Sequence, residues 1–299
     1  MDYKQWLTIA ETQLQETVTE NPSMNGRQEA ILLLQIVTKR SKASILAFSE
    51  TPLTATELAQ LSAVLARRVK GEPIAYIVGE KEFWSLPLKV STETLIPRPD
   101  TEILVEQALD MAKQRLNSPH FSGELAMLDL GTGTGAIALA LASELQPIAR
   151  KCGVRLRIVG VDRIAEAVAL AQENATANQL SATFLQSTWF DELSPDHPFD
   201  LIVSNPPYID EKDPHLALGD VRFEPLSALV AAEQGYADLR HIIEQAPLFL
   251  KPKGALLLEH GWQQGEKVRS IFAENGWQQI QTLQDYGHNE RVTSACIEG

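Results

Sequence analysis

The sequence has little cysteine. Its 299 residues include only Cys152 and Cys296, whose separation matches neither a metal site nor a disulfide framework, so we expect a reducing compartment, the cytoplasm. The chain does not open with a basic segment followed by an apolar run, which argues against a signal peptide. Apolar runs such as Ile31 to Leu34 are far too short to span a bilayer. The six histidines show no ligand spacing, so no metal is expected.

Positive charge is also scarce. There are 26 Lys and Arg against 39 Asp and Glu, which gives a net charge of −13. Because proteins bind nucleic acid largely by neutralising phosphates with Lys and Arg, this balance argues against a stable nucleic-acid partner. The hydrophobic fraction of 44% is typical of a soluble globular protein, and the length suits one large and one smaller domain. We expect a monomeric enzyme with a protein or small-molecule substrate and no membrane partner.

Residues 1–72 are predicted to form a small helical domain. Apolar residues recur at helical spacing from Trp6 to Val18 and from Ala30 to Val37. Thr54 and Glu57 have the spacing of a capping box that opens a further helix. This part carries no cofactor motif, so we predict that it recognises the protein substrate.

Residues 73–98 are predicted to be a β-hairpin linker. Two β-prone runs, Ile74–Val78 and Glu82–Trp84, flank a turn that contains glycine. Pro97 and Pro99 then interrupt the extended pattern and precede a helix.

Residues 99–299 alternate strand and helix patterns, which predicts a doubly wound, mostly parallel sheet with an antiparallel last strand. The expected strands are Ala126–Leu130, Arg155–Val161, Thr183–Gln186, Phe199–Ser204, Ala255–Glu259, Gln278–Leu283 and Val292–Ile297. The stretch from Gln146 to Arg157 is interpreted as a surface loop that runs into the second strand. Such sheets bind ligands beyond the carboxyl ends of their strands, so function is sought there.

A glycine-rich turn follows the first of these strands. Gly131, Thr132, Gly133, Thr134 and Gly135 lie between the strand and the next helix. Glycines let the backbone turn tightly and approach a ligand, and the amides that open the helix favour a polar or anionic group. The spacing also satisfies the dinucleotide pattern, so this motif alone does not separate a nicotinamide enzyme from a methyltransferase.

An acidic residue, Asp162, ends the second strand. A carboxylate at this position can accept hydrogen bonds from both ribose hydroxyls of a nucleoside. It can also cap the following helix, and the two roles are compatible.

The motif that decides between these classes is Asn-Pro-Pro-Tyr after the fourth strand. The two prolines stiffen the loop, which holds the Asn205 side chain and the Pro206 carbonyl as fixed acceptors. Pro207 leads into Tyr208, whose ring offers a face for stacking. Two acceptors and a ring match a planar –NH2 group, and a fold needs no such sequence at the end of a buried strand.

Asn-Pro-Pro-Tyr resembles the amino-methyltransferase motif, which is shared by enzymes that methylate adenine N6, cytosine N4 and glutamine N5. The chain as a whole resembles the release factor glutamine methyltransferase family (HemK/PrmC type) much more closely. The matching stretches are 67–73, 82–87, 95–102, 129–139, 204–210, 222–226, 258–261 and 289–292.

This resemblance implies a class I S-adenosylmethionine-dependent methyltransferase domain over 99–299. By resemblance, the Gly131–Gly135 turn wraps the methionine part of the cofactor, Asp162 holds the ribose and Trp189 lines the adenine pocket. Asn205 to Tyr208 grip the substrate amide, with Asn205 also at the cofactor, and Arg98 borders the cleft from the linker.

The implied reaction transfers a methyl group to N5 of the glutamine in the Gly-Gly-Gln motif of class I peptide chain release factors and leaves S-adenosylhomocysteine. Three alternatives stay open. An adenine-N6 nucleic-acid methyltransferase would use the same motif, although the acidic charge weighs against it. A nicotinamide oxidoreductase leaves Asn-Pro-Pro-Tyr unexplained, and so does a non-catalytic protein that keeps only the cofactor fold. Glu224 and Glu259 could be structural or could line the cleft.

Overall fold

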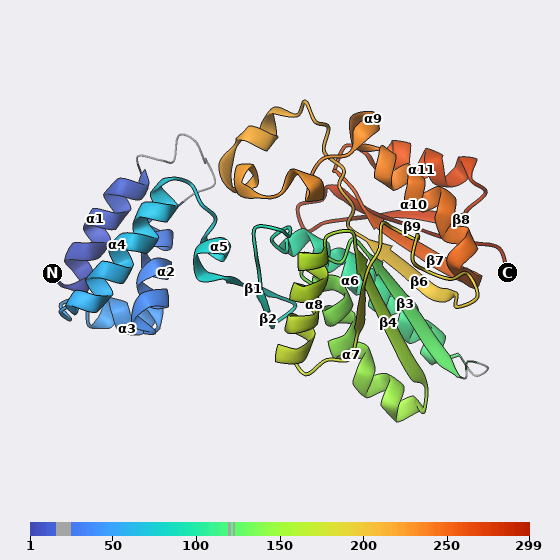
Figure 1. Ribbon diagram of the computed structural model, residues 1–299, viewed down its shortest axis with the longest axis horizontal. Helices are drawn as coiled ribbons and strands as arrows, with labels where there is room; N and C mark the ends of the chain where they lie inside the picture. The colour runs from blue at the N-terminus through green and yellow to red at the C-terminus, as the bar shows by residue number, and fades with distance from the viewer. Residues whose placement is uncertain (16–24, 119–120, 122) are drawn as a thin grey trace. The chain divides into compact units, whose positions relative to one another are not determined.

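The computed structural model describes residues 1–15, 25–118, 121 and 123–299. The chain divides into two compact units, which are coloured by residue number in Figure 1. The first unit consists of Met1–Gly79 and Pro214–Phe223, and the second of Glu80–Asp213 and Glu224–Gly299. Within the described residues, no helix combines the length and the apolar character needed to cross a membrane.

The first unit is helical. Its elements are α1 (Tyr3–Gln15), α2 (Gly26–Thr38), α3 (Lys42–Ala47), α4 (Ala55–Val69), α5 (Ile74–Val78) and the 3-10 helices η2 (Pro214–Ala217) and η3 (Gly219–Phe223). Their apolar faces share a core that includes Trp6 and Leu61. Thr54 and Glu57 form the reciprocal capping box that the sequence predicts at the start of α4. Positions 16–18 of the first predicted helix lie outside the described residues.

A buried cation joins the separate pieces of the first unit. Arg68, near the end of α4, is only 2% exposed. Its guanidinium lies 2.6 Å from Glu29 of α2 and 2.9 Å from Asp220 of η3, and it also donates to the carbonyls of Gly71 and Glu72. Because a buried charge requires a full set of partners, these bonds hold η3 against the helices of the N-terminal segment.

The second unit is built on a mixed sheet. Within the described residues this sheet has seven strands in the order β5-β4-β3-β6-β7-β9-β8. They are β3 (Glu124–Leu130), β4 (Arg155–Asp162), β5 (Thr183–Gln186), β6 (Phe199–Ser204), β7 (Leu250–Glu259), β8 (Gln278–Gln284) and β9 (Glu290–Cys296). β3 to β7 are parallel, and β9 is antiparallel to both β7 and β8. This confirms the predicted doubly wound sheet with an antiparallel last strand.

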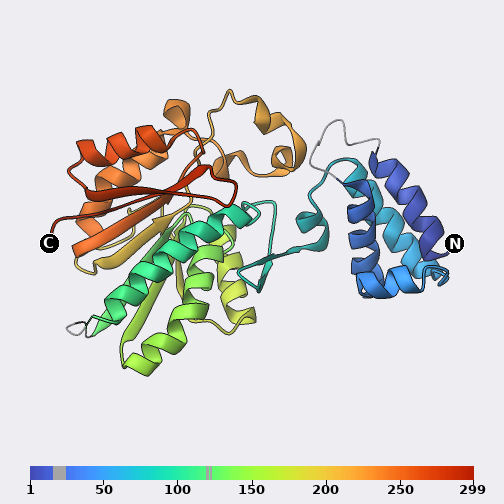
Figure 2. The same ribbon diagram turned by 180° about the vertical axis from the view of Figure 1, so that it is seen from behind.

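Helices cover both faces of the sheet (Figures 1 and 2). One layer contains α6 (Glu102–Leu116), α7 (Ala136–Cys152) and α8 (Ala165–Ala177), and the other contains α10 (Ala237–Gln245) and α11 (Gly265–Glu274). Side chains alternate between the layers along β3, with Leu125 and Met127 in the first and Ala126 and Leu128 in the second. The short elements are η1 (Pro99–Thr101), η4 (Leu226–Ala228), α9 (Ala232–Gly235) and η5 (Ala246–Phe249).

The predicted hairpin lies further along the chain than expected. The prediction of a strand at Ile74–Val78 is wrong, because this run forms α5. Pro73 precedes its first turn and Gly79 ends it in the left-handed conformation, with a φ of 80°. A proline before and a glycine after are typical helix boundaries, and here they outweigh the β propensity of the run. The hairpin strands are β1 (Glu80–Phe83) and β2 (Leu86–Lys89).

The predicted surface loop from Gln146 to Arg157 is also wrong. α7 continues through this stretch to Cys152, and β4 begins at Arg155. Pro147 lies inside the helix, where it removes a backbone donor, but the buried Leu145 and Ala149 keep the helix in its layer.

A buried amide on α8 helps to fasten the hairpin to the helix layer. Asn174 of α8 is fully buried and accepts a hydrogen bond from the Lys89 amide at 2.8 Å. Its Nδ2 donates to the carbonyls of Lys89 and Thr134 at 3.0 and 2.9 Å. Because Thr134 belongs to the glycine-rich turn, this amide sets the spacing between the hairpin and that turn.

Candidate functional site

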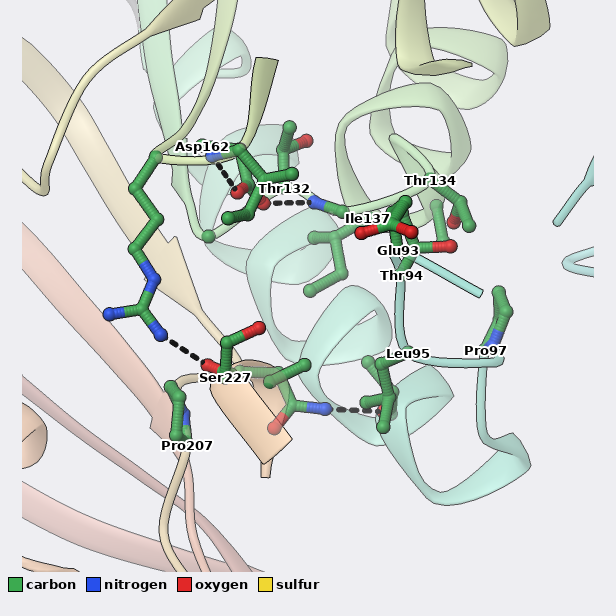
Figure 3. Close-up of a pocket in the computed structure, with 18 of the residues that line it drawn as sticks. Glu93, Thr94, Leu95, Pro97, Thr132, Thr134, Ile137, Asp162, Pro207 and Ser227 are labelled. Carbon is green, nitrogen blue, oxygen red and sulfur yellow. Dashed lines mark hydrogen bonds between the residues drawn. The ribbon is translucent and has the colours of Figure 1, made fainter. Parts of the chain in front are cut away.

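A cavity in the second unit lies where β3, β4 and β6 end, and it encloses about 920 Å³ of empty space, part of it open to solvent. In Figure 3, Thr132 and Asp162 lie together at the end of the sheet, while Leu95 and Pro97 lie across the cavity from Ser227. The lining also contains Gly131, Gly133, Thr134, Trp189, Asn205 and Pro207 among the residues predicted from the sequence. Three motifs that are distant in the sequence therefore meet at one site.

The glycine-rich turn presents bare backbone to this cavity. Gly131 and Gly133 have positive φ values of 69° and 53°, which glycine adopts without steric cost. A Cβ at Gly133 would meet open space, so the backbone borders room for a ligand. Gly135 instead allows close packing, because a Cβ there would lie 3.2 to 3.3 Å from Ala171 and other side chains that pack beneath the turn.

A buried carboxyl shapes the same turn from below. Asp129 Oδ2 accepts hydrogen bonds from the Thr132 hydroxyl at 2.6 Å and from the Ala138 amide at 3.1 Å. Burial raises the pKa of Asp129 to about 7, against the effect of these two donors. Since Thr132 belongs to the turn and Ala138 to the first turn of α7, Asp129 fixes the glycine-rich turn to the start of the helix.

Asp162 ends β4 and lines the cavity. Its two carboxyl oxygens accept hydrogen bonds from the amides of Gly133, at 2.9 Å, and Ile164, at 3.0 Å. Burial raises the pKa of Asp162, while these donors act to lower it. Each carboxylate oxygen has a second acceptor position, so Asp162 can hold the turn and still accept from a ligand.

Trp189 supplies an aromatic side to the cavity. Its ring lies 3.5 Å from the position of a Cβ on Gly131, and burial raises the pKa of Asp238 in α10 while the nearby Trp189 side chain acts to lower it. The backbone of Trp189 has a φ of 50°, which is uncommon for a bulky residue. The ring therefore lies beside the glycine-rich turn.

The Asn-Pro-Pro-Tyr motif follows β6. Asn205 Nδ2 donates to the Thr101 hydroxyl at 3.2 Å. Its Oδ1 is buried and has no hydrogen-bond partner among the described residues. Pro207 lines the cavity, whereas the buried Pro206 and the half-buried Tyr208 are outside the lining in the part of the chain that the structure describes.

Close contacts hold the backbone at the last residue of the motif, Tyr208. The Tyr208 carbonyl accepts a hydrogen bond from Gln264 Nε2 at 3.0 Å. Gly235, with a φ of 89°, approaches so closely that a Cβ there would lie 2.2 Å from the same carbonyl oxygen. The Tyr208 hydroxyl lies 3.5 Å from Glu259 Oε1, and burial raises the pKa of Tyr208.

The cavity also has lining residues that the motifs did not identify. Thr101 and Ser227 are two of them, whereas Glu224 is outside the lining: its fully buried side chain accepts a hydrogen bond from the Ile96 amide at 3.0 Å and pairs with the lining residue Arg98. Thr101 lies in the stretch that resembles the family, although only Arg98 was singled out there. No sequence signal marked Ser227, which reaches the cavity from η4.

The chemistry of the site is that of polar acceptors and an aromatic ring. Over the residues that the structure describes, no three His, Cys, Asp or Glu side chains gather as a metal site would require.

Comparison with known proteins gives the site a context. Residues 121–294 match a family model described as "Methyltransferase domain", and residues 5–79 match one described as "PrmC N-terminal domain". The chain is 70% identical over 296 residues to the release factor glutamine methyltransferase of Pasteurella multocida, with 99% of each chain covered. It is 53% identical to that of Escherichia coli, with 98% of each covered. Among solved structures, the hMettl16 catalytic domain matches with a TM-score of 0.52 at 15% identity, over 78% of this chain and 81% of that one, which shows the fold alone.

Proposed function

Because the chain belongs to the release factor glutamine methyltransferase family, we propose that it methylates the N5 amide nitrogen of a release factor glutamine with S-adenosylmethionine. The observation that carries this proposal is the Asn205 side chain. Its oxygen is buried without a partner among the described residues, beside a cavity that is open to solvent. A buried, unsatisfied acceptor costs on the order of 1–3 kcal/mol, and an N–H of a bound substrate amide would satisfy it.

We infer that S-adenosylmethionine binds at the glycine-rich turn, Asp162 and Trp189, with Asn205 at its edge. The residues fit this ligand, because Gly133 borders open space and Asp162 keeps acceptor positions for ribose hydroxyls. Trp189 offers its ring to an adenine. When bound, the cofactor supplies a methyl group on a sulfonium, which is already a strong electrophile.

The residues of this chain act mainly by positioning the substrate. An amide nitrogen is a poor nucleophile, because its lone pair is delocalised into the carbonyl group. Asn205 Oδ1 and the Pro206 carbonyl would accept hydrogen bonds from the two N–H groups of the substrate amide and thereby fix its plane. Tyr208 would contact the face of that amide. Such alignment can lower a barrier by roughly 7–11 kcal/mol. The same acceptors favour the positive charge that develops on nitrogen, so no strong base is required, and the proton leaves to solvent.

Class I release factors with a Gly-Gly-Gln motif are the proposed protein substrates, and the first unit is the proposed recognition element. We propose that the enzyme works as a monomer in the cytoplasm, without a stable nucleic-acid partner. Adenine methylation is not favoured, because relatives that match nearly the whole chain are named release factor glutamine methyltransferases.

The test is mass spectrometry of a release factor after incubation with the enzyme and labelled S-adenosylmethionine. We expect one methyl group on the glutamine of Gly-Gly-Gln and none on a release factor in which alanine replaces that glutamine. An adenine-containing oligonucleotide is the parallel acceptor. Label on the oligonucleotide but not on the release factor would overturn the proposal.

A further inference from the structure

Glu259 is a buried carboxyl with no part in the mechanism described above. It ends β7, next to β6 in the sheet, and is only 1% exposed. The Tyr208 hydroxyl lies 3.5 Å from its Oε1, whereas Oε2 has no hydrogen-bond partner among the described residues. Burying a carboxyl raises the free energy of the folded state unless the carboxyl is hydrogen-bonded or paired with a charge. The position of Glu259 beside the substrate motif therefore requires an explanation.

Thr101 connects this carboxyl to Asn205. The Thr101 hydroxyl is close enough to Glu259 to lower the pKa of that carboxyl as a donor, against the effect of burial. The same hydroxyl oxygen accepts the hydrogen bond from Asn205 Nδ2 at 3.2 Å. Thr101 is buried and lines the cavity. The three side chains come from η1, the loop after β6 and the end of β7, which are far apart in the sequence.

The direction of these hydrogen bonds follows from simple donor counting. A hydroxyl has one proton to donate, and a carboxylate can only accept. When the Thr101 proton points to Glu259, Thr101 can only accept from Asn205. Asn205 must then turn its –NH2 group to Thr101, which directs its oxygen away from Thr101.

We propose that Glu259 is a positioning residue, which acts through Thr101 to keep the Asn205 side-chain oxygen turned toward the substrate amide. The inference rests on the proposed function, because it assigns to Asn205 the role of accepting a substrate N–H. Without an obligatory acceptor at position 259, the Thr101 hydroxyl can donate to Asn205. The Asn205 side chain then rotates by half a turn, so that its –NH2 group faces the –NH2 group of the substrate amide and no acceptor is left for the substrate.

Ionisation of Glu259 gives this inference a distinct signature. Burial raises the pKa of Glu259 to about 7, aided by the negative charge of Asp100, while Thr101, Arg291 and Tyr208 act to lower it. The protonated carboxyl can donate to Thr101 and reverse the chain of hydrogen bonds, whereas the carboxylate cannot. We therefore expect kcat/KM for the release factor to rise with pH through about 7, at saturating S-adenosylmethionine.

The experiment compares Thr101→Val, Thr101→Ser and Glu259→Gln with the wild-type enzyme, on an intact release factor. Valine keeps the shape of threonine but removes the hydroxyl, so we expect kcat/KM to fall by about 10- to 100-fold, in the range of a small misplacement of a reacting group. Serine restores the hydroxyl and should bring kcat/KM back to within a few-fold of wild type. Glu259→Gln should lower kcat/KM and abolish the rise of kcat/KM through pH 7. Calorimetry should show wild-type affinity for S-adenosylmethionine in all three.

The outcomes separate the two hypotheses. A wild-type enzyme that leaves the glutamine unmodified refutes the function and this inference with it. If the wild type methylates the glutamine and Thr101→Val is equally fast, or if serine fails to rescue, only the role of Glu259 falls. The threonine pair keeps the test valid if Glu259→Gln does not fold, and a folded Glu259→Gln enzyme that keeps the pH dependence also overturns the inference.

Discussion

Replacing Asn205 by alanine should separate activity from stability. The substitution removes the Asn205–Thr101 hydrogen bond of 3.2 Å, which contributes about 0.5–1.5 kcal/mol to a typical fold. It also removes an acceptor that is buried without a partner among the described residues, which relieves about 1–3 kcal/mol. These effects oppose each other, so we expect a net change in the free energy of unfolding between a loss of about 0.5 kcal/mol and a gain of about 2.5 kcal/mol. Transfer, in contrast, should slow by about 10²–10³, as for the loss of one preorganised polar contact.

The assay is single-turnover methylation of a release factor at saturating enzyme and cofactor, with urea unfolding and calorimetry of S-adenosylmethionine as controls. Asn205→Asp is the matched variant, because it keeps an acceptor of nearly the same shape and should retain more activity than alanine. Cofactor binding should persist in both variants, since Asp162 and the glycine-rich turn remain. Wild-type rates in Asn205→Ala would refute the role of this side chain in binding the amide.

Three further substitutions test other parts of the molecule. Asp162→Ala should weaken S-adenosylmethionine binding by roughly 10- to 100-fold in calorimetry, because hydrogen bonds to a charged acceptor are lost, and unchanged affinity would contradict its proposed role. Gly235→Ala should push away the Tyr208 carbonyl, 2.2 Å from the new Cβ, and slow methylation more than it weakens cofactor binding; a wild-type rate would show that the loop accommodates the methyl group. Arg68→Ala should destabilise the first unit by roughly 3–5 kcal/mol, measured by hydrogen exchange in α4, and unaltered exchange would show that its ion pairs contribute little.

Much of the fold could be predicted because its signals are local. Strand and helix patterns alternate along the second unit, and the capping box of Thr54 and Glu57 marks the start of α4. The errors arose where two local signals compete. In Ile74–Val78 the β-branched residues suggested a strand, but the flanking proline and glycine bound a helix. The stretch from Gln146 to Arg157 looked longer than a usual connection and suggested a surface loop, but the buried Leu145 and Ala149 continue α7 through Pro147.

The candidate site was only partly predictable, for a different reason. The glycine-rich turn, Asp162 and Asn205 each follow a strand, and parallel strands bring their carboxyl ends to one edge of the sheet. Thr101 and Glu259 carry no chemical signature of their own, so their link to Asn205 becomes visible only when η1, the loop after β6 and the end of β7 are packed together.

The split composition of the first unit affects how the protein is made. Arg68 and its partner Asp220 are 152 positions apart, so at about 5–20 residues per second roughly 8–30 s of synthesis separate them. During that interval α4 exists without η3, and Arg68 lacks one of its two acidic partners. A nascent chain therefore holds an incomplete helical unit until most of the sheet has been translated. For the same reason, a chimaera that exchanges only residues 1–79 with those of a relative would transplant part of a domain, and Pro214–Phe223 must be exchanged with them.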